Sequence, residues 1–242
     1  MFLDGCGAPV DNMISSVAWL SLTIAIWLIC VALAKRLPYL LIGNPLVLGI
    51  VSICLLLHFW GEDAQTYLKA VYPLTFFVGL ATVALAIPLW QQRVLISNNA
   101  SAMFIATLIT TVSGIGTAWL IGAMLGLSGS EFASIAPKMT TLAVALPLST
   151  ATGGWESLTI LGVMCNGVGG VIISEPAWRL FGKTLKSEDK AFALGITSHA
   201  MGIARALSIS PYTVAFASCG MLLSALMTTA LYAAFELWQA LI

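Results

Sequence analysis

One lysine lies inside an apolar stretch, where a charged side chain is costly. Lys138 belongs to the sequence SIAPKMTT at 134–141, and a charge at the centre of a bilayer costs at least about 2.5–3.5 kcal/mol. An anion, a carboxylate or local water must offset that cost. Pro137 suits the first turn of a helix, whose free N–H groups would point toward the same place, and Thr140 and Thr141 add hydroxyl donors. These residue types suit a small carboxylate; the alternative is a lysine that reaches the membrane surface from the tip of a re-entrant segment.

A second group of polar residues lies in a short apolar segment near the C-terminus. Ser198, Gly202 and Ala206 recur every four residues, a spacing of small residues that lets another helix approach closely. Ser198 and Arg205 are seven residues apart and would share one face of a continuous helix. The guanidinium of Arg205 suits bidentate binding of a carboxylate, and the imidazole of His199 suits proton coupling. The alternatives are a histidine bonded to a neighbouring carbonyl and an arginine that reaches the membrane surface.

Four further positions are weaker candidates. Gly153 and Gly154 end the apolar segment that contains the lysine. Asn44 precedes Pro45, as an N-cap residue does before the first turn of a helix. Asn166 lies between glycines four residues before and after it, which also fits helix packing with one interhelical hydrogen bond. We assign Asn44 and Asn166 a supporting role, with capping and packing as their respective alternatives.

Eight apolar runs must position these residues. They cover 14–34, 42–59, 71–90, 101–126, 132–149, 157–174, 191–204 and 212–235. A spanning helix needs roughly 20 apolar residues, and six of the runs suit that purpose. The fifth and seventh runs differ because proline, glycine and charged residues interrupt them. We therefore predict an all-α polytopic membrane protein with a single integral membrane domain, 1–242. It would have about six full transmembrane helices and two discontinuous or re-entrant segments.

The placement of charges tests whether the fifth run crosses the membrane. Cytoplasmic loops carry the excess of Lys and Arg, and an extracellular N-terminus places Glu131 outside. The loop with Arg179, Lys183, Lys186 and Lys190 then falls inside only if segment 132–155 enters and returns. Segment 191–206 would enter from the opposite face in the same way, as in an inverted repeat. Interrupted segments in paired positions indicate a transporter site near the midplane; ordinary kinked helices are the alternative.

Composition excludes several other classes of protein. Of the 242 residues, 60% are hydrophobic and 8% are charged, whereas soluble domains carry roughly 25% charged residues. Ten basic residues balance ten acidic ones, so a nucleic-acid partner is not expected. The five cysteines show no spacing typical of a metal or redox site. Without an HExxH, GxSxG or P-loop motif, we expect neither an enzyme nor a cofactor.

The order of these motifs resembles that of the LrgB/CidB membrane protein family. SHAMGIARA at 198–206 is similar to the family pattern Ser-His-x-x-Gly-Thr-Ala-x-Ala, which follows a basic loop. PKMTT at 137–141 is similar to its Pro-Lys-Ser-Val-Thr-Thr-Pro motif. VALAIP at 83–88, Asn-Pro at 44–45 and Gly-Gly at 153–154 also fit, and the resemblance runs from about residue 15 to the C-terminus. Ile203, Ser208 and Met139 depart from the family pattern, which removes hydroxyls and one carboxylate, so the chain resembles a divergent member.

The resemblance implies two competing functions. Some family members are antiholin-like or holin-partner proteins that modulate murein hydrolase release and cell lysis beside a small LrgA/CidA-type membrane protein. Others are similar to carriers of glycolate, glycerate or pyruvate. Charges in broken membrane segments favour transport, because they are costly for a passive lysis factor. We therefore predict a secondary transporter of a small monocarboxylate, with an antiholin-like regulator as the alternative.

The predicted transporter works by alternating access in the bacterial cytoplasmic membrane. The residues predicted to bind substrate are Lys138, Thr140, Thr141, Gly153, Gly154, Ser198 and Arg205. His199 is the candidate for proton coupling. The expected partners are the lipid bilayer and the carboxylate, and the resemblance implies an LrgA/CidA-type protein. A second copy of the chain is also expected, because alternating access needs a fixed scaffold.

Overall fold

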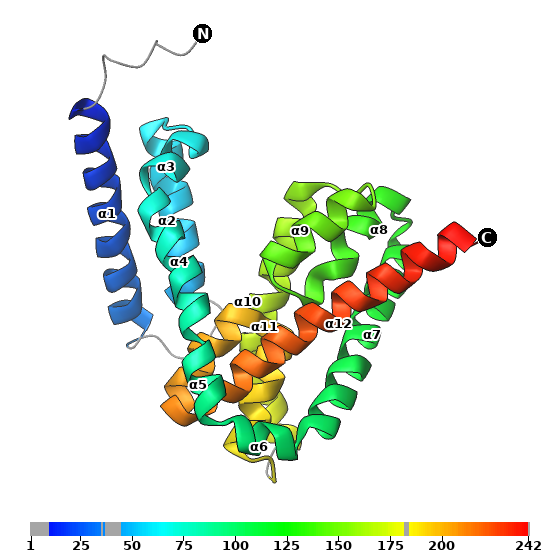
Figure 1. Cartoon of the computed structure of the whole chain (residues 1–242). Helices are drawn as coiled ribbons and strands as arrows, with labels where there is room; N and C mark the ends of the chain where they lie inside the picture. The colour runs from blue at the N-terminus through cyan, green and yellow to red at the C-terminus, as the bar shows by residue number, and fades with distance from the viewer. Residues whose placement is uncertain (1–9, 35, 37–44, 182–183, 242) are drawn as a thin grey trace. The chain divides into compact units, whose positions relative to one another are not determined.

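The computed structural model describes residues 10–34, 36, 45–181 and 184–241. The chain divides into two compact units, Met1–Ala84 and Leu85–Ile242, and each is described below by itself. Within the described ranges every regular element is a helix (Figure 1), which confirms the predicted all-α class.

Several helices are suited to a membrane. In the described part, five are long and apolar enough to cross one, or six if Val47–Trp60 and Ala64–Ala70, bent by 118° at their junction, count as one span. One of the five, Ser187–Ile209, meets this criterion by length and composition but is broken at His199, as described below. Large apolar side chains are widely exposed: Phe59 by 83% and Met124 by 79%. Lipid makes such a surface favourable and water does not, so the predicted polytopic membrane protein is confirmed.

The first unit holds the first two expected spans and the first part of the third. Its helices are α1 (Val10–Ala34), α2 (Pro45–Trp60), α3 (Ala64–Ala70) and α4 (Tyr72–Ala84). Trp19 of α1 contacts the rings of Trp60 and Tyr67, with centroids 5.8 and 5.5 Å apart. These aromatic contacts hold α1 against α2 and α3. Asn44, predicted to have a supporting role, lies outside the described residues.

The run at 71–90 is interrupted, contrary to the single helix expected there. Helix α4 ends at Ala84, and α5 begins at Ala86. The cause is Pro88, which lacks an N–H and whose ring would clash with the carbonyl four residues earlier, that of Ala84.

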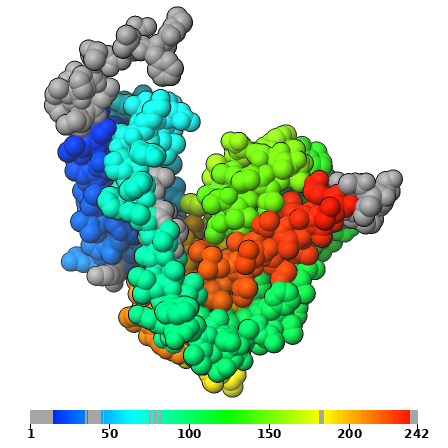
Figure 2. Space-filling view, in the orientation of Figure 1, coloured from blue at the N-terminus to red at the C-terminus, as the bar shows by residue number. Residues whose placement is uncertain are grey.

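The second unit contains the remaining elements. They are α5 (Ala86–Gln91), α6 (Arg93–Asn98), α7 (Ala100–Leu125), α8 (Gly129–Ile135), the 3-10 helix η2 (Ala136–Met139), α9 (Leu142–Ala151), α10 (Glu156–Phe181), α11 (Ser187–Ile209), the 3-10 helix η3 (Pro211–Thr213) and α12 (Val214–Leu241). Helix α12 lies across the surface beside α9 and α7 (Figure 2). With 26 residues, α10 is about 39 Å long, enough to cross a bilayer.

The segment with the lysine forms a hairpin, which we call the first hairpin (129–151). Its backbone leaves the helical conformation at Thr140 and Thr141, where ψ is 176° and 152°. The chain then returns, because the backbone N–H of Trp155 donates to Ser134 Oγ at 2.7 Å. A Cβ on Gly154 would lie 2.8 Å from the nitrogen of Ser134. Both ends of this segment therefore lie side by side, as a re-entrant segment requires.

Helix α11 also folds back on itself and forms the second hairpin (187–209). Its backbone breaks at His199, where φ is 52° and ψ is −125°. A Cβ on Gly202 would overlap the carbonyl oxygen of Leu194, although residues eight apart in a continuous helix are about 12 Å apart. The chain thus reverses at His199. The expectation that Ser198 and Arg205 share one face of a continuous helix is therefore wrong.

The two hairpins are attached to opposite ends of α10. The first precedes Glu156 and the second follows Phe181, and both point toward the middle of that helix (Figure 1). This agrees with two broken segments that enter from opposite faces. The arrangement brings residues near 140 and near 199 together.

Candidate functional site

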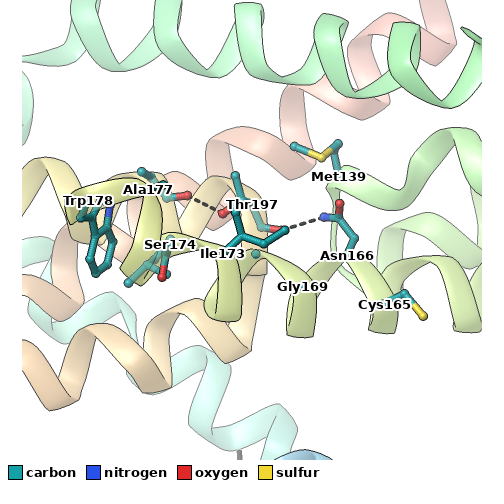
Figure 3. Close-up of a pocket in the computed structure, with 12 residues that line it drawn as sticks. Met139, Cys165, Asn166, Gly169, Ile173, Ser174, Ala177, Trp178 and Thr197 are labelled. Carbon is teal, nitrogen blue, oxygen red and sulfur yellow. Dashed lines mark hydrogen bonds between the residues drawn. The ribbon is translucent and has the colours of Figure 1, made fainter. Parts of the chain in front are cut away.

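The tips of both hairpins meet beside the middle of α10. A cavity of about 450 Å³ is lined by Met139 from the first hairpin, Thr197 from the second, and Asn166 and Gly170 from α10 (Figure 3). We call this meeting point, with Thr140, Ser198 and His199 at the tips, the crossing. It is assembled from the two segments that the sequence singled out.

Glycines allow the tips to approach the long helices closely. A Cβ on Gly114 of α7 would overlap the side chain of Met139, and one on Gly170 of α10 would overlap Ser198 Oγ. Each tip thus packs against a glycine of the long helix that precedes its hairpin. This equivalence is what an inverted repeat would produce.

Neighbouring helices satisfy the carbonyl groups that the two breaks leave unpaired. The break at residue 199 removes the helical donor to the Thr197 carbonyl, and Asn166 Nδ2 donates to that oxygen at 2.7 Å instead. The hydroxyl of Ser224 on α12 donates to the Met139 carbonyl. Asn166 therefore holds the second hairpin to α10, as the interhelical bond expected from its spacing.

The returning arm of the first hairpin begins at the crossing. Helix α9 starts at Leu142, and within the described residues the side chain of its N-cap, Thr141, makes no capping hydrogen bond. The first N–H groups of a helix carry partial positive charge. The start of α9 therefore supplies a positive end beside Thr140.

Three buried side-chain atoms have no hydrogen-bond partner among the residues that the structure describes: Thr111 Oγ1, Thr140 Oγ1 and His199 Nε2. Thr140 is 0% exposed and His199 is 4% exposed. Thr111 lies one turn before Gly114 on the buried face of α7. A buried polar group without a partner costs about 1–3 kcal/mol, so these atoms suit a polar ligand or water.

The backbone at His199 adds a further cost. It is the one residue other than glycine with a positive φ among those described, a conformation that costs of order 1–3 kcal/mol and is typical of ligand clamps and switch regions. The sequence motif identified His199 and Ser198 but not this conformation. Thr111 was not identified from the sequence as a site residue. The one pattern that could have indicated it is its position on the same face of α7 as Thr107 and Gly114.

Most of the predicted site residues lie at or beside the crossing. Thr140, Ser198 and His199 are buried there, and Thr141 begins α9. Lys138 is half-buried in η2, next to Met139. The structure thus groups residues that are about 60 positions apart in the sequence.

The structure places the two glycines elsewhere. Gly153 has a φ of 79°, and Gly154 packs against Ser134 and Ser149. They close the first hairpin at the end opposite its tip. Their geometry explains the chain reversal before α10 and does not bring them to the crossing.

Arg205 lies on the returning arm of the second hairpin and is paired. Its Nη2 donates to Glu175 Oε2 of α10 at 3.2 Å, and its Nη1 donates to Ser208 Oγ at 3.1 Å. Arg179 lies 3.7 Å from the same carboxylate. The structure therefore joins Arg205 to Glu175 of α10.

The residue types at the crossing suit a small polar anion. Within the described residues, no group of three or more His, Cys, Asp and Glu side chains could hold a metal ion. Hydroxyls, an imidazole and a helix N-terminus lie there, with Lys138 in the adjoining η2, and groups of these kinds bind carboxylates through hydrogen bonds and charge.

Comparisons of the chain with family models and with known proteins agree on one family. Residues 23–238 match the model of the LrgB-like family. The chain is 26% identical to the holin-like protein CidB of Staphylococcus aureus over 222 residues, which cover 92% of this chain and 96% of the relative. It is 27% identical to the antiholin-like protein LrgB of Bacillus subtilis over 199 residues, 81% of this chain and 84% of the relative. No solved structure matches the chain.

Proposed function

Because the chain belongs to the LrgB-like family of multi-pass bacterial membrane proteins, we propose that it is a secondary transporter of a small monocarboxylate of the glycolate, glycerate or pyruvate class. One observation carries the proposal: two broken hairpins from opposite ends of α10 meet where buried polar atoms have no hydrogen-bond partner among the residues described. Irregular backbone at membrane depth is tolerated where it lines a cavity or is buried in protein. Such an arrangement serves a carrier that must bind a polar solute away from either surface.

The substrate would bind through the residues at the crossing. The hydroxyl of Thr140 and the start of α9 would hold the carboxylate, and Lys138 would balance its charge. Thr111, from α7, would add a second hydroxyl. Ser198 and His199 would contact the substrate from the second hairpin, with His199 also able to carry a proton.

Alternating access would follow from the two hairpins. Each hairpin lies between the crossing and one end of α10, because its two arms begin and end on that side. Movement of one hairpin at a time would expose the crossing first to one side and then to the other. A second copy of the chain would supply the fixed scaffold for such movement, and an LrgA/CidA-type membrane protein would be a further partner.

The test is uptake of labelled pyruvate, glycolate and glycerate into proteoliposomes, with and without a proton gradient. Lys138→Gln and Thr140→Val should lower saturable uptake, and Thr229→Val should not, because Thr229 is exposed and its hydroxyl donates to the carbonyl of Ala225 in its own helix. Faster uptake with a proton gradient would indicate proton coupling.

The holin-like and antiholin-like names of the relatives favour a second function. In that case the chain would regulate murein hydrolase export and cell lysis. It would move none of the three acids, with an LrgA/CidA-type partner absent or present. That result would refute transport, and a lysis phenotype that depends on the partner would then support regulation.

A further inference from the structure

A second cavity of about 450 Å³ lies between α7 and the first arm of the second hairpin. Its outer end is polar and charged, with Asn99, Lys186, Glu188 and Asp189. Its inner end is lined by Thr110. Charged side chains mark the outer end as open to water, since they are seldom left facing lipid.

The cavity is long enough to reach the middle of a membrane. The lining residues of α7 recur on successive turns from Asn99 through Ala106 to Thr110. Eleven residues of helix rise about 16 Å, which is about half the thickness of the hydrocarbon core. The cavity therefore extends from the loop before α11 to the depth of the crossing.

The inner end of this cavity adjoins the crossing. Thr197 lines both cavities, and Thr111, whose buried hydroxyl has no partner among the described residues, directly follows Thr110. Thr110 and Thr197 donate their hydroxyl hydrogens to carbonyls of their own helices at 2.7 and 2.8 Å. Their oxygens keep lone pairs that can accept hydrogen bonds from water.

We propose that this second cavity is an aqueous entrance, through which the carboxylate reaches the crossing from the side of the 184–190 loop. The inference rests on the proposed transport function and adds the route of the substrate and the side of the membrane from which it enters. Lys186 and Lys190 of that loop are balanced by Glu188 and Asp189, so the outer end would admit the solute through water rather than attract it by net charge. A cavity filled by a lipid chain is the competing occupant, and the test separates the two.

The first experiment measures labelling of single cysteines with a charged, membrane-impermeant thiol reagent. In a chain whose five natural cysteines are replaced by serine, Thr110→Cys probes the cavity. Ile109→Cys is the matched control, because Ile109 is at the same depth of α7 and is 63% exposed on another face. Lys186→Cys reports the side of the membrane from which the reagent acts.

We expect Thr110→Cys to react on the order of tenfold faster than Ile109→Cys, because the reactive thiolate forms in water and not in lipid. It should react from the same side as Lys186→Cys. Equal rates at the two positions, no reaction at either, or reaction from the opposite side would refute the proposal that this cavity is an aqueous entrance.

The second experiment uses the natural chain and needs no cysteine replacement. Ala106→Trp would fill the cavity, whereas Ile105→Trp would place the same ring on a face that is 55% exposed outside it. Uptake should fall on the order of tenfold in the first variant and stay unchanged in the second. Equal uptake in both would overturn the route. Absence of uptake in the unmodified chain would instead refute the transport function, and the labelling contrast would still decide whether the cavity is aqueous.

Discussion

Replacement of Thr140 by valine separates a ligand-binding hydroxyl from a structural one. Thr140 is 0% exposed, and its hydroxyl has no partner among the described residues. Valine has nearly the same shape but no hydroxyl. Because a buried hydroxyl without a partner costs about 1–3 kcal/mol, the variant should unfold at the same temperature or a few degrees higher, at about 2–4 °C per kcal/mol.

Transport should respond in the opposite direction. A hydrogen bond to a charged group contributes about 1.5–3 kcal/mol, so its loss should raise KM about 10- to 100-fold. Uptake of the labelled acid in proteoliposomes measures KM, and a thermal unfolding assay in detergent measures stability. Together the assays should show a protein at least as stable that binds its substrate worse.

Thr159→Val is the matched control. Thr159 is also 0% exposed, but its hydroxyl donates to Ser149 Oγ at 2.6 Å. Its replacement should lower the free energy of unfolding by about 1 kcal/mol and leave KM unchanged. If Thr140→Val lost stability as Thr159→Val does, or kept both its stability and its KM, the assignment of Thr140 to the substrate site would be refuted.

Three other substitutions test contacts of the two hairpins. Gly170→Ala should destabilise the protein and lower uptake because its Cβ would overlap the tip of the second hairpin. Gly116→Ala, on α7 with open space at that position, should do neither. Arg205→Gln should lower the unfolding temperature but not raise KM. In a double-mutant cycle with Glu175→Gln, the two effects on stability should couple by about 1 kcal/mol, because the paired side chains are 25% and 36% exposed. A raised KM without such coupling would instead show that Arg205 binds the substrate. Hydrogen bonds from the neighbouring serine hold the pKa of Glu131 below its usual value, so Glu131→Ala should destabilise the protein at neutral pH. That difference should vanish as the pH falls through the lowered pKa and protonates the native carboxyl.

Local sequence patterns were enough to predict the first hairpin. Proline and lysine interrupt its apolar run, and the basic loop that follows α10 fits the cytoplasmic side only if the segment returns. Both signals are local or depend on simple charge counting. The residues at its tip, Thr140 and Thr141, were therefore found together with the fold.

Local sequence patterns were not enough to predict where the second hairpin reverses. Glycine and charged residues mark 191–206 as an interrupted segment, but the place of the reversal, at His199, depends on contacts with distant parts of the chain. Gly202 allows contact with Leu194, and Asn166 bonds the carbonyl that the break frees. The pairing of Arg205 with Glu175, 30 residues earlier, is equally a product of the reversal, so spacing within one segment predicted the wrong neighbour.

Helix α10 is shared by both hairpins, which makes its length matter more than most of its side chains. Insertion of one residue between Glu156 and Asn166 would rotate everything before it by about 100° relative to everything after it. The tip of the first hairpin would then turn away from that of the second, although neither hairpin had changed. This chain should therefore accept many substitutions along α10 but no change in its length, whereas the loop at 126–128, outside this shared register, should accept insertions.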